Sequence, residues 1–318
     1  MSDETYLVTG AMGCLGTWVV KLLLDEGCDV VAFDASDDDH RHRLVIEPEA
    51  AARVRYVTGD LTDLDQVKTV VQGASHIIHL AALQVPFCRA NRPLGAAVNV
   101  VGTVNVMEAA VDSSIQHLTY ASSVAVFGNA SEYEEVVLDP SEFRAPTTLY
   151  GVWKCANEST ARIFQIDYGL PSVGLIPHTV YGPGRDQGLT SQPTTAMLSA
   201  VRKTPYHIEY GGFLALQFAP DVARDFVRAS RLVTSNAELH GIGGTVASIP
   251  EVVSLIRSIT GFEEITHGSD ELPFPQAVSS ASWEERVGGV SYTPLEESIG
   301  QTVEWFERAR SAGLPLPT

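Results

Sequence analysis

The 318-residue sequence contains few cysteines and shows no pairing pattern among them. Cys14, Cys28, Cys88 and Cys155 form no CxxC motif, and no histidine follows or precedes them at the sequence spacing typical of metal ligands. Small secreted disulfide-rich proteins are dense in cysteine, and zinc sites combine Cys and His at short, regular spacings. The sequence therefore argues against a disulfide framework and against a metal site, and it indicates a reducing, cytoplasmic compartment.

Basic residues are also scarce, with 21 Lys and Arg against 39 Asp and Glu, a formal net charge of −18. Such a field repels nucleic acids and anionic membrane surfaces. We find no apolar run of the roughly 18 to 20 residues that a membrane-spanning helix needs. The start, MSDETYLVTG, lacks the basic region of a signal peptide. We expect a soluble protein with neither a nucleic-acid nor a membrane partner.

Short apolar segments alternate with helical patterns through the first two-thirds of the chain. The expected strands are 6–8, 29–33, 55–57, 76–80, 117–126 and 172–176, and the expected helices are 15–26, 63–72, about 93–113 and about 148–168. Strands that alternate with helices form a parallel sheet covered on both faces. The predicted fold class is therefore α/β, a doubly wound parallel sheet with a smaller, mostly C-terminal substrate domain.

The alternation loosens beyond about residue 180. Gly, Pro, Ser and Thr predict a long loop over 182–195, and long loops in compact enzymes are usually functional or mobile. Ser248 and Thr293 each begin a capping-box sequence with an early proline, which predicts two later helices. We expect a dinucleotide-binding domain of residues 1–180 and 216–244, and a substrate-binding domain of residues 181–215 and 245–318.

A glycine-rich sequence, TGAMGCLG, joins the first expected strand to the first expected helix at residues 9–16. Its GxxGxxG spacing allows a tight turn and brings the backbone close to a pyrophosphate, whose charge the helix N-terminus stabilises. Asp34 ends the second strand, where a carboxylate binds an adenosine ribose and repels a 2′-phosphate. The pattern favours NAD over NADP, although Arg41 or Arg43 on a flexible loop offers an alternative partner for a phosphate.

Further motifs follow in order along nearly the whole chain. They are GDL at 59–61, HLAA at 79–82, NVVGTVN at 99–105, YASSVAVFG at 120–128, YGVWK at 150–154 with Glu158, VYGPGR at 180–185 and YTPLEESIGQTVEWF at 292–306. With the glycine turn and Asp34, this set resembles the extended short-chain dehydrogenase/reductase family, in its NAD-dependent epimerase/dehydratase branch. The resemblance implies a Rossmann-type fold, NAD as cofactor, and an enzyme that moves a hydride at a secondary alcohol.

The resemblance also implies individual roles. Tyr150 would be the acid/base, with Lys154 beside it, and Ser123 would assist the substrate oxygen. Strand alternation lets only one of Ser122 and Ser123 face the site, and the resemblance selects Ser123. The residues expected to bind the cofactor are Gly10, Met12, Gly13, Cys14, Leu15, Gly16, Asp34, Asp60, Leu61, Leu80, Ala81, Ala82, Asn99, Tyr150, Lys154 and Pro177.

The spacing i, i+4 places Tyr150 and Lys154 on one helix face. A free tyrosine has a pKa near 10 and is a poor base at neutral pH. Lowering that pKa to about 7 requires roughly 4 kcal/mol of preferential stabilisation of the phenolate. We expect the Lys154 ammonium and a positive nicotinamide ring to supply it in a partly desolvated cleft.

The substrate is less well defined. Nucleotide-sugar enzymes of the family that the chain resembles carry an Asn just before VYGP and a later arginine, which grip a diphosphate. Here Thr179 stands at the first position, and no arginine occurs between Arg202 and Arg224. Without these charge-assisted contacts, we expect a smaller substrate: a free sugar, a sugar acid or a polyol. Its candidate contacts are Gln84, Ser123, Thr148, His178, Arg185 and Ser191.

Some of these candidates have competing interpretations. Arg185 fits a carboxylate partner and a solvated loop position equally well, and His178 fits a hydrogen-bonded histidine beside the sheet better than a catalyst. For the whole protein we predict a dehydrogenase that releases NADH. The alternatives are a sugar epimerase that retains NAD, and a redox-sensing binding protein, which the presence of Tyr150 and Lys154 disfavours. Apolar residues on several faces of the 93–113 and 148–168 helices, which pair across a twofold axis in the similar family, predict a homodimer.

Overall fold

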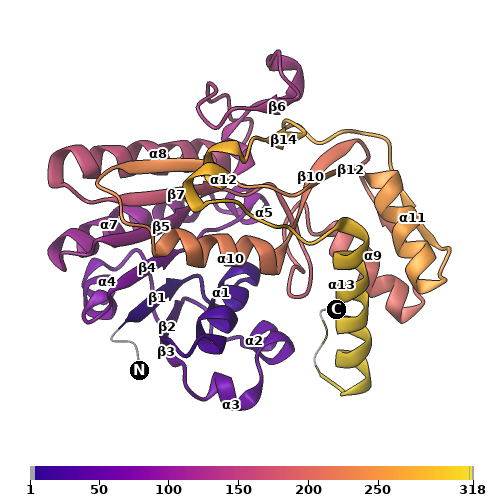
Figure 1. The fold of residues 1–318 in the computed structure, drawn as a ribbon, viewed down its shortest axis with the longest axis horizontal. Helices are drawn as coiled ribbons and strands as arrows, with labels where there is room; N and C mark the ends of the chain where they lie inside the picture. Colours follow the sequence, from indigo (N-terminus) through magenta and orange to yellow (C-terminus); the bar gives the residue numbers. More distant parts are fainter. Residues whose placement is uncertain (1–3, 315, 317–318) are drawn as a thin grey trace.

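The computed structural model describes residues 4–314 and 316, and its centre is a seven-stranded parallel sheet (Figure 1). The strand order is β11-β7-β5-β4-β1-β2-β3. The strands are β1 (Thr5–Thr9), β2 (Asp29–Asp34), β3 (Arg55–Thr58), β4 (His76–His79), β5 (His117–Ala121), β7 (Ser172–Ile176) and β11 (Ala237–Gly241). The order reverses between β1 and β4, and open α/β sheets bind ligands at the carboxyl ends of the strands at such a point. The predicted Rossmann-type fold is confirmed.

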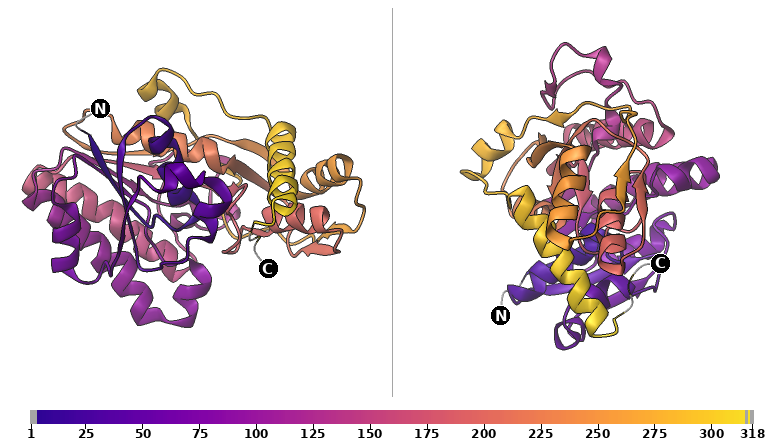
Figure 2. Two further views of the ribbon diagram at one scale, coloured as in Figure 1. Left: turned by 90° about the horizontal axis from the view of Figure 1, so that it is seen from below. Right: turned by 90° about the vertical axis from the view of Figure 1, so that its right-hand side faces the viewer.

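Both faces of this sheet are buried because its strands are apolar on both sides. On β1, Leu7 packs with one core cluster, whereas Tyr6 and Val8 pack with another. Figures 1 and 2 show the helices of the two layers. The first layer contains α4 (Leu64–Val71), α7 (Gly102–Asp112) and α8 (Leu149–Tyr168), and the second contains α1 (Cys14–Asp25) and α10 (Ala219–Ser230).

A second lobe lies beside the sheet, at the right of Figure 1. It contains a three-stranded sheet of β8 (Thr179–Tyr181), β10 (Phe213–Phe218) and β12 (Thr245–Ser248), with helices α9 (Gln192–Arg202), α11 (Ile249–Thr260) and α13 (Leu295–Ser311) packed together. Two short parallel pairs are β9 (Tyr206–Ile208) with β13 (Ile265–His267), and β6 (Val137–Leu138) with β14 (Ala277–Val278). The remaining helices are α2 (His40–Val45), α3 (Pro48–Ala51), α5 (Val85–Ala90), α6 (Arg92–Ala96) and α12 (Ala281–Val287).

We propose that the two lobes are the two domains expected from the sequence, with one adjustment. Strand β10 pairs with β8 and β12 and therefore goes with the smaller lobe. Helix α10 and strand β11 then return the chain to the large sheet. The boundary proposed at residue 216 is better drawn after Phe218, where β10 ends.

Three expected elements have different limits in the structure. The strand expected over 117–126 ends at Ala121, because the Ser123 hydroxyl accepts a hydrogen bond from Ala125 N and a 3₁₀ turn follows at Val124–Val126. The loop expected over 182–195 ends at Ser191, where α9 begins. The helix expected near 93–113 starts at Arg92 and contains a π-helical turn at Ala97–Val101.

The two predicted helix caps have different outcomes. Ser248 caps α11, since its hydroxyl accepts a hydrogen bond from Glu251 N. Thr293 does not cap α13, which begins at Leu295. The buried Asp221 carboxylate instead accepts hydrogen bonds from both Thr293 N, at 2.7 Å, and the Thr293 hydroxyl, at 3.2 Å. A charged acceptor on α10 thus competes successfully with a local cap.

One helix, Arg92–Asp112, is long and apolar enough to span a membrane by length and composition alone, with a mean hydropathy of 1.5. It corrects the expectation that the chain has no such stretch. Half of its most apolar window is buried in the protein, and its α7 part packs against α4 and α8. Core helices of globular proteins meet the same criteria, so this helix is weak evidence for a membrane span. The first residues of the acidic start, 1–3, lie outside the described part of the chain.

Candidate active site

A cavity of about 760 Å³ lies at the carboxyl ends of the central strands and extends toward the smaller lobe. It brings together most of the residues predicted from the sequence. The predicted residues that line it are Gly10, Met12, Gly13, Cys14, Leu15, Gly16, Asp34, Asp60, Leu61, Leu80, Ala81, Ala82, Gln84, Ser123, Tyr150, Lys154, Pro177, His178 and Arg185. Three predicted residues, Asn99, Thr148 and Ser191, are not part of its lining.

The glycine turn packs closely against its neighbours. Gly10 has a positive φ of +69°, and a Cβ there would lie 2.6 Å from Ala81 N at the end of β4. A Cβ on Gly16 would lie 2.1 Å from the Gly10 carbonyl oxygen. Gly13 is the N-cap of α1, and no side chain caps this helix end. The first backbone N–H groups of α1 therefore face the cavity without a side-chain acceptor, which suits a phosphate.

Asp34 lies beside this turn at the end of β2. Its carboxylate accepts hydrogen bonds from Met12 N, at 2.9 Å, and from Ser36 N, at 3.0 Å. Both donors are backbone groups in the cavity wall, so the carboxylate is held in place, and within the described residues no Lys, Arg or His nitrogen lies within 4.0 Å of it. Such a carboxylate suits a ribose diol and repels a 2′-phosphate.

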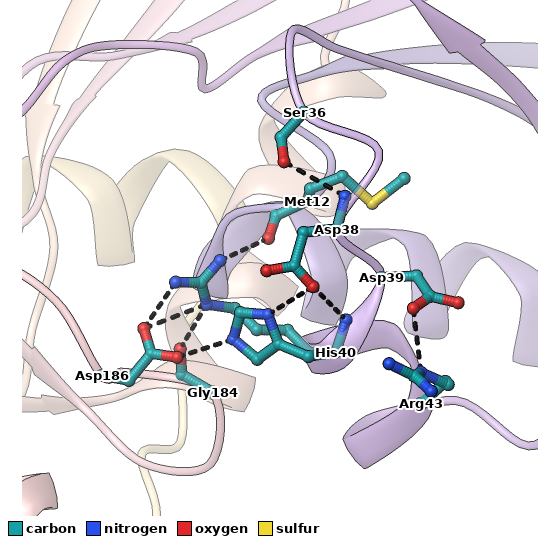
Figure 3. A network of polar contacts seen from close by, with 9 residues as sticks. Met12, Ser36, Asp38, Asp39, His40, Arg43, Gly184 and Asp186 are labelled. Atoms are coloured by element: carbon teal, nitrogen blue, oxygen red, sulfur yellow. Dashed lines mark hydrogen bonds and ion pairs between the residues drawn. The ribbon is translucent and has the colours of Figure 1, made fainter. Parts of the chain in front are cut away.

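A polar network joins the start of α2, which follows β2, to the loop after β8 (Figure 3). Arg41 donates to Met12 O at 2.9 Å and to an Asp186 carboxylate oxygen at 2.5 Å from Nη2. The His40 ring lies 2.8 Å from the other Asp186 oxygen. Arg43 pairs with Asp39 on the surface at 2.8 Å. Both arginines that left the choice of cofactor open therefore already have carboxylate partners, which favours NAD.

Tyr150 and Lys154 lie in the first turns of α8, which the Thr148 hydroxyl caps by accepting from Gly151 N. The Ser123 hydroxyl lies near the Tyr150 phenol and lines the same cavity. Lys154 Nζ donates to Ala121 O at 2.7 Å and lies 5.7 Å from the centre of the Tyr150 ring. The Ser122 hydroxyl points elsewhere and donates to Glu158. Of the two adjacent serines, the structure places Ser123 beside the tyrosine.

The electrostatics of this pair differ from the expectation. Burial raises the pKa of Tyr150, while the hydrogen bond from Ser123 and the charge of Arg185 act against that rise. Burial also lowers the pKa of Lys154 to about 8. The ammonium lies near the ring and bonds a backbone carbonyl, so it does not offset the desolvation of the phenol.

Arg185 reaches the part of the cavity nearest the smaller lobe. Its Nη2 donates to the Thr190 hydroxyl at 3.2 Å, and its buried Nε has no partner. In the amide orientation that satisfies both ends of Gln84, the Gln84 oxygen accepts from Arg185 Nη1 at 3.3 Å. This guanidinium is therefore held by neutral groups only and keeps an unused donor, as an anion-binding group would.

His178 lines the same region but already has partners for both ring nitrogens. They are the Thr179 hydroxyl, at 3.1 Å, and the Pro275 carbonyl oxygen, at 2.8 Å. Burial lowers the pKa of His178 to about 4, so the ring is neutral at physiological pH. This geometry fits the hydrogen-bonded histidine favoured in the sequence analysis.

The three predicted residues outside the lining have structural contacts. Asn99 bonds both backbone groups of Leu83, at 2.7 and 2.9 Å, and thereby shapes the cavity wall from behind. Thr148 caps α8, and the Ser191 hydroxyl donates to Gly188 O at 2.9 Å. An apolar part of the wall was not predicted; it consists of Leu83, Val85, Phe87, Leu189 and Phe274. No local signal marks Phe274, which only the tertiary fold brings to the site.

The cysteines and acidic residues form no further centre. All four cysteines are free thiols, and Cys14, Cys28 and Cys88 are buried. Within residues 4–314 and 316, no group of three or more His, Cys, Asp or Glu side chains is placed to hold a metal ion.

The strand order, the glycine turn at an uncapped helix end and the carboxylate after β2 define a dinucleotide-binding protein of the Rossmann class. The model of the NAD dependent epimerase/dehydratase family matches residues 6–238. The chain belongs to this family, and its cofactor is NAD. The site fits NAD, because Gly10, Gly13 and Gly16 have no Cβ in the turn that would hold the pyrophosphate, and Asp34 lines the cavity beside this turn.

Relatives with different activities resemble the chain to a similar degree. Cinnamoyl-CoA reductase 1 of Oryza sativa subsp. japonica is 29% identical, over 93% of this chain and 88% of the relative. UDP-glucose 4-epimerase of Mycolicibacterium smegmatis is 26% identical, over 94% and 97%. The solved structure of MoeE5 in complex with UDP-glucuronic acid and NAD is 28% identical, with a TM-score of 0.81 over 96% of this chain and 100% of that chain. Family membership therefore defines the type of enzyme but not the individual reaction.

Proposed function

We propose that this protein transfers a hydride between NAD and a secondary alcohol of a small sugar, sugar acid or polyol-like substrate. The observation that carries this proposal is the grouping of Tyr150, Ser123 and Lys154 in the wall of the cavity that also contains the glycine turn. We assign catalysis to these three residues and cofactor binding to the predicted residues that line the cavity.

Each of the three has a distinct part in the chemistry. Tyr150 accepts the hydroxyl proton of the substrate as its carbon loses a hydride, and Ser123 orients the reacting oxygen. Bound NAD⁺ supplies the hydride acceptor and a positive ring that stabilises the phenolate. Lys154, which lines the same cavity, would hold the ribose of the cofactor and adds its own positive charge. The pKa of Tyr150 is raised by burial in the protein itself, so the cationic groups must offset the cost of desolvation.

The charges in the cavity support a substrate with at most one strongly anionic group. Three arginine or lysine side chains line it: Arg41, Lys154 and Arg185. Arg41 is paired with Asp186, and Lys154 lies against the catalytic ring. Arg185 remains, and one guanidinium suits one carboxylate rather than a diphosphate. Leu214 and Leu216, in the segment that lacks the expected arginine, are buried in the core.

An epimerase with retained NAD is the second candidate. It is supported by the similarity to a UDP-glucose 4-epimerase and to the MoeE5 complex with UDP-glucuronic acid and NAD. The two functions differ in their products. Incubation of the full-length protein with sugars, sugar acids, polyols and nucleotide sugars distinguishes them: net NADH supports the dehydrogenase, and interconversion of sugars without net NADH supports the epimerase.

Replacement of Tyr150 by Phe tests the assignment under either function. We expect turnover to fall by at least about 100-fold, since general acid–base groups contribute 10²- to 10⁴-fold, while NAD binding is nearly unchanged. Tyr168→Phe is the matched control, because Tyr168 lies on the same helix and is 59% exposed. A Tyr150→Phe protein with full activity would show that another group is the base.

We also propose a homodimer in the cytoplasm. Exposed apolar side chains at Leu94, Val101, Val152, Ile163 and Ile166 form a face on α8 and the neighbouring Arg92–Asp112 helix. A face of this kind suits a twofold helical interface, and the free cysteines suit a reducing compartment. Ile163→Glu is expected to convert a dimer into a monomer in sedimentation equilibrium. A wild-type protein that is already monomeric at micromolar concentration would contradict the proposal.

A further inference from the structure

Three consecutive residues at the end of β5 face three side chains of α8. Ala121 O accepts from Lys154 Nζ at 2.7 Å, Ser122 donates to Glu158, and Ser123 lies near Tyr150. The α8 residues are spaced i, i+4 and i+8, so they form one row along the helix. The two catalytic positions of α8 thus have a third member, Glu158, which belongs to the same contact between strand and helix.

Glu158 is held from both sides. One carboxylate oxygen accepts from Ser122, and the other accepts from Arg144 Nε at 2.9 Å. The Arg144 guanidinium donates to Glu142 O at 2.6 Å and lies 4.7 Å from the centre of the Phe127 ring. The Glu158 side chain is only 10% exposed. A carboxylate with both oxygens bonded in this way stays in place.

Lys154 lacks such a partner. It is 3% exposed, and within the described residues no carboxylate lies within 4.0 Å of its ammonium. Its hydrogen bond goes to a neutral carbonyl. A buried ammonium without a counter-ion tends to lose its proton, so the nearest fixed negative charge determines whether Lys154 is charged at neutral pH.

The groups that face Lys154 come from three elements. On α8 they are Tyr150 and Glu158; on α5 there is Cys88, and on β4 there is His79. The His79 ring lies between the Thr9 and Thr103 hydroxyls, and burial lowers its pKa to about 3, so it is neutral. Burial also raises the pKa of the Cys88 thiol. Glu158 is therefore the carboxylate of this set, and its charge favours the Lys154 ammonium.

We propose that Glu158, held by Ser122 and Arg144, is a positioning residue that keeps Lys154 charged and fixes the catalytic row of α8 against β5. The inference rests on the proposed function for the importance of Lys154. Its physical content, the dependence of the Lys154 charge on Glu158, does not require any particular substrate. The charge of Glu158 lowers the energy of the Lys154 ammonium and thus raises the pKa of that group against the effect of burial.

The test is a direct titration of Lys154 by NMR in the full-length chain labelled with ¹³Cε-lysine. The chain has four lysines, so the spectrum is simple, and Lys154→Met assigns the signal. In Glu158→Gln, which retains the shape and a hydrogen-bond acceptor, we expect the Lys154 titration to move to a pH lower by roughly half to one unit. Glu238→Gln is the matched control, since Glu238 is also paired with an arginine, Arg286, but is not among the groups that act on Lys154.

Two further variants separate charge from structure. Ser122→Ala removes the hydrogen bond but leaves the charge, so the Lys154 titration should stay near its wild-type position. An equal downward shift in Ser122→Ala, or no shift in Glu158→Gln, would overturn the proposal. If Glu158→Gln does not fold, Arg144→Ala provides the test: loss of the neighbouring cation should raise the Lys154 pKa, and an unchanged or lower value would refute the charge argument. These titrations use no substrate, so their outcome is independent of whether the proposed reaction is correct.

Discussion

The glycine turn offers the sharpest prediction, because one added methyl group should act differently at each glycine. In Gly10→Ala the new Cβ would lie 2.6 Å from Ala81 N and 2.7 Å from Ala81 Cα. These are backbone atoms, so no rotamer change relieves the overlap. A left-handed conformation costs a non-glycine residue roughly 1–2 kcal/mol, and overpacking adds typically about 1–3 kcal/mol. We expect a loss of about 2–5 kcal/mol in the free energy of unfolding.

Binding should respond at the same position. Relief of the overlap requires the turn to move away from β4, which displaces the N-terminus of α1 relative to Asp34 at the cavity. A loss of about 1.4 kcal/mol in binding corresponds to a tenfold weaker Kd, and we expect at least this for NAD⁺. Urea denaturation and isothermal titration calorimetry measure the two effects.

Substitutions at two other glycines should affect either the stability of the fold or the affinity for NAD⁺, but not both. Gly27 has a φ of +80°, and nothing lies within 4 Å of a Cβ there, so Gly27→Ala should cost roughly 1–2 kcal/mol of stability and leave NAD affinity unchanged. Gly13 faces the cavity, and a Cβ there meets only Gly10 O, at 3.2 Å. Gly13→Ala should therefore be nearly as stable as the wild type but bind NAD⁺ at least about tenfold more weakly. Wild-type NAD affinity in Gly13→Ala would refute the placement of the dinucleotide over this turn.

Acid should destabilise the fold, because burial lowers the pKa of His79 to about 3 and of His178 to about 4. Below about pH 6.5, the pKa of a histidine in the unfolded chain, these two rings bind a proton when the protein is unfolded but not when it is folded. Each ring therefore lowers the free energy of unfolding by about 2 kcal/mol at pH 5. Burial raises the pKa of Asp225 to about 6, so this group acts in the opposite sense and stabilises the fold by about 1.4 kcal/mol at pH 5. From these three groups we expect urea denaturation to show a net loss of about 3 kcal/mol in the free energy of unfolding between pH 7 and 5. A flat profile would contradict this prediction. In Asp186→Asn, the partly released Arg41 should lower the preference for NAD⁺ over NADP⁺ by roughly tenfold in calorimetry; an unchanged ratio would show that this ion pair does not affect cofactor choice.

Local patterns predicted most of the fold. Apolar runs with their flanking glycines marked every strand of the large sheet except β11, and helical spacing marked α4 and α8 to within two residues. The glycine turn, Asp34 and the Tyr150–Lys154 spacing are also local features, since each depends on a few consecutive residues or on one helix turn. That is the physical reason they were accessible from the sequence: hydrogen bonding along the backbone and burial of an apolar face follow from residue order over short distances.

Contacts between distant segments decided the rest. Arg41 is ion-paired with Asp186, 145 residues later. Thr293 donates a hydrogen bond to Asp221 and does not cap α13. The raised pKa of Tyr150 likewise depends on how completely the folded chain excludes water from the phenol. Charge pairing and desolvation are set by the groups that fold brings within a few ångströms, whatever their separation in sequence. The sequence therefore predicted which residues would carry the proposed chemistry, whereas the tertiary structure decided which of them are charged, paired or open to a ligand.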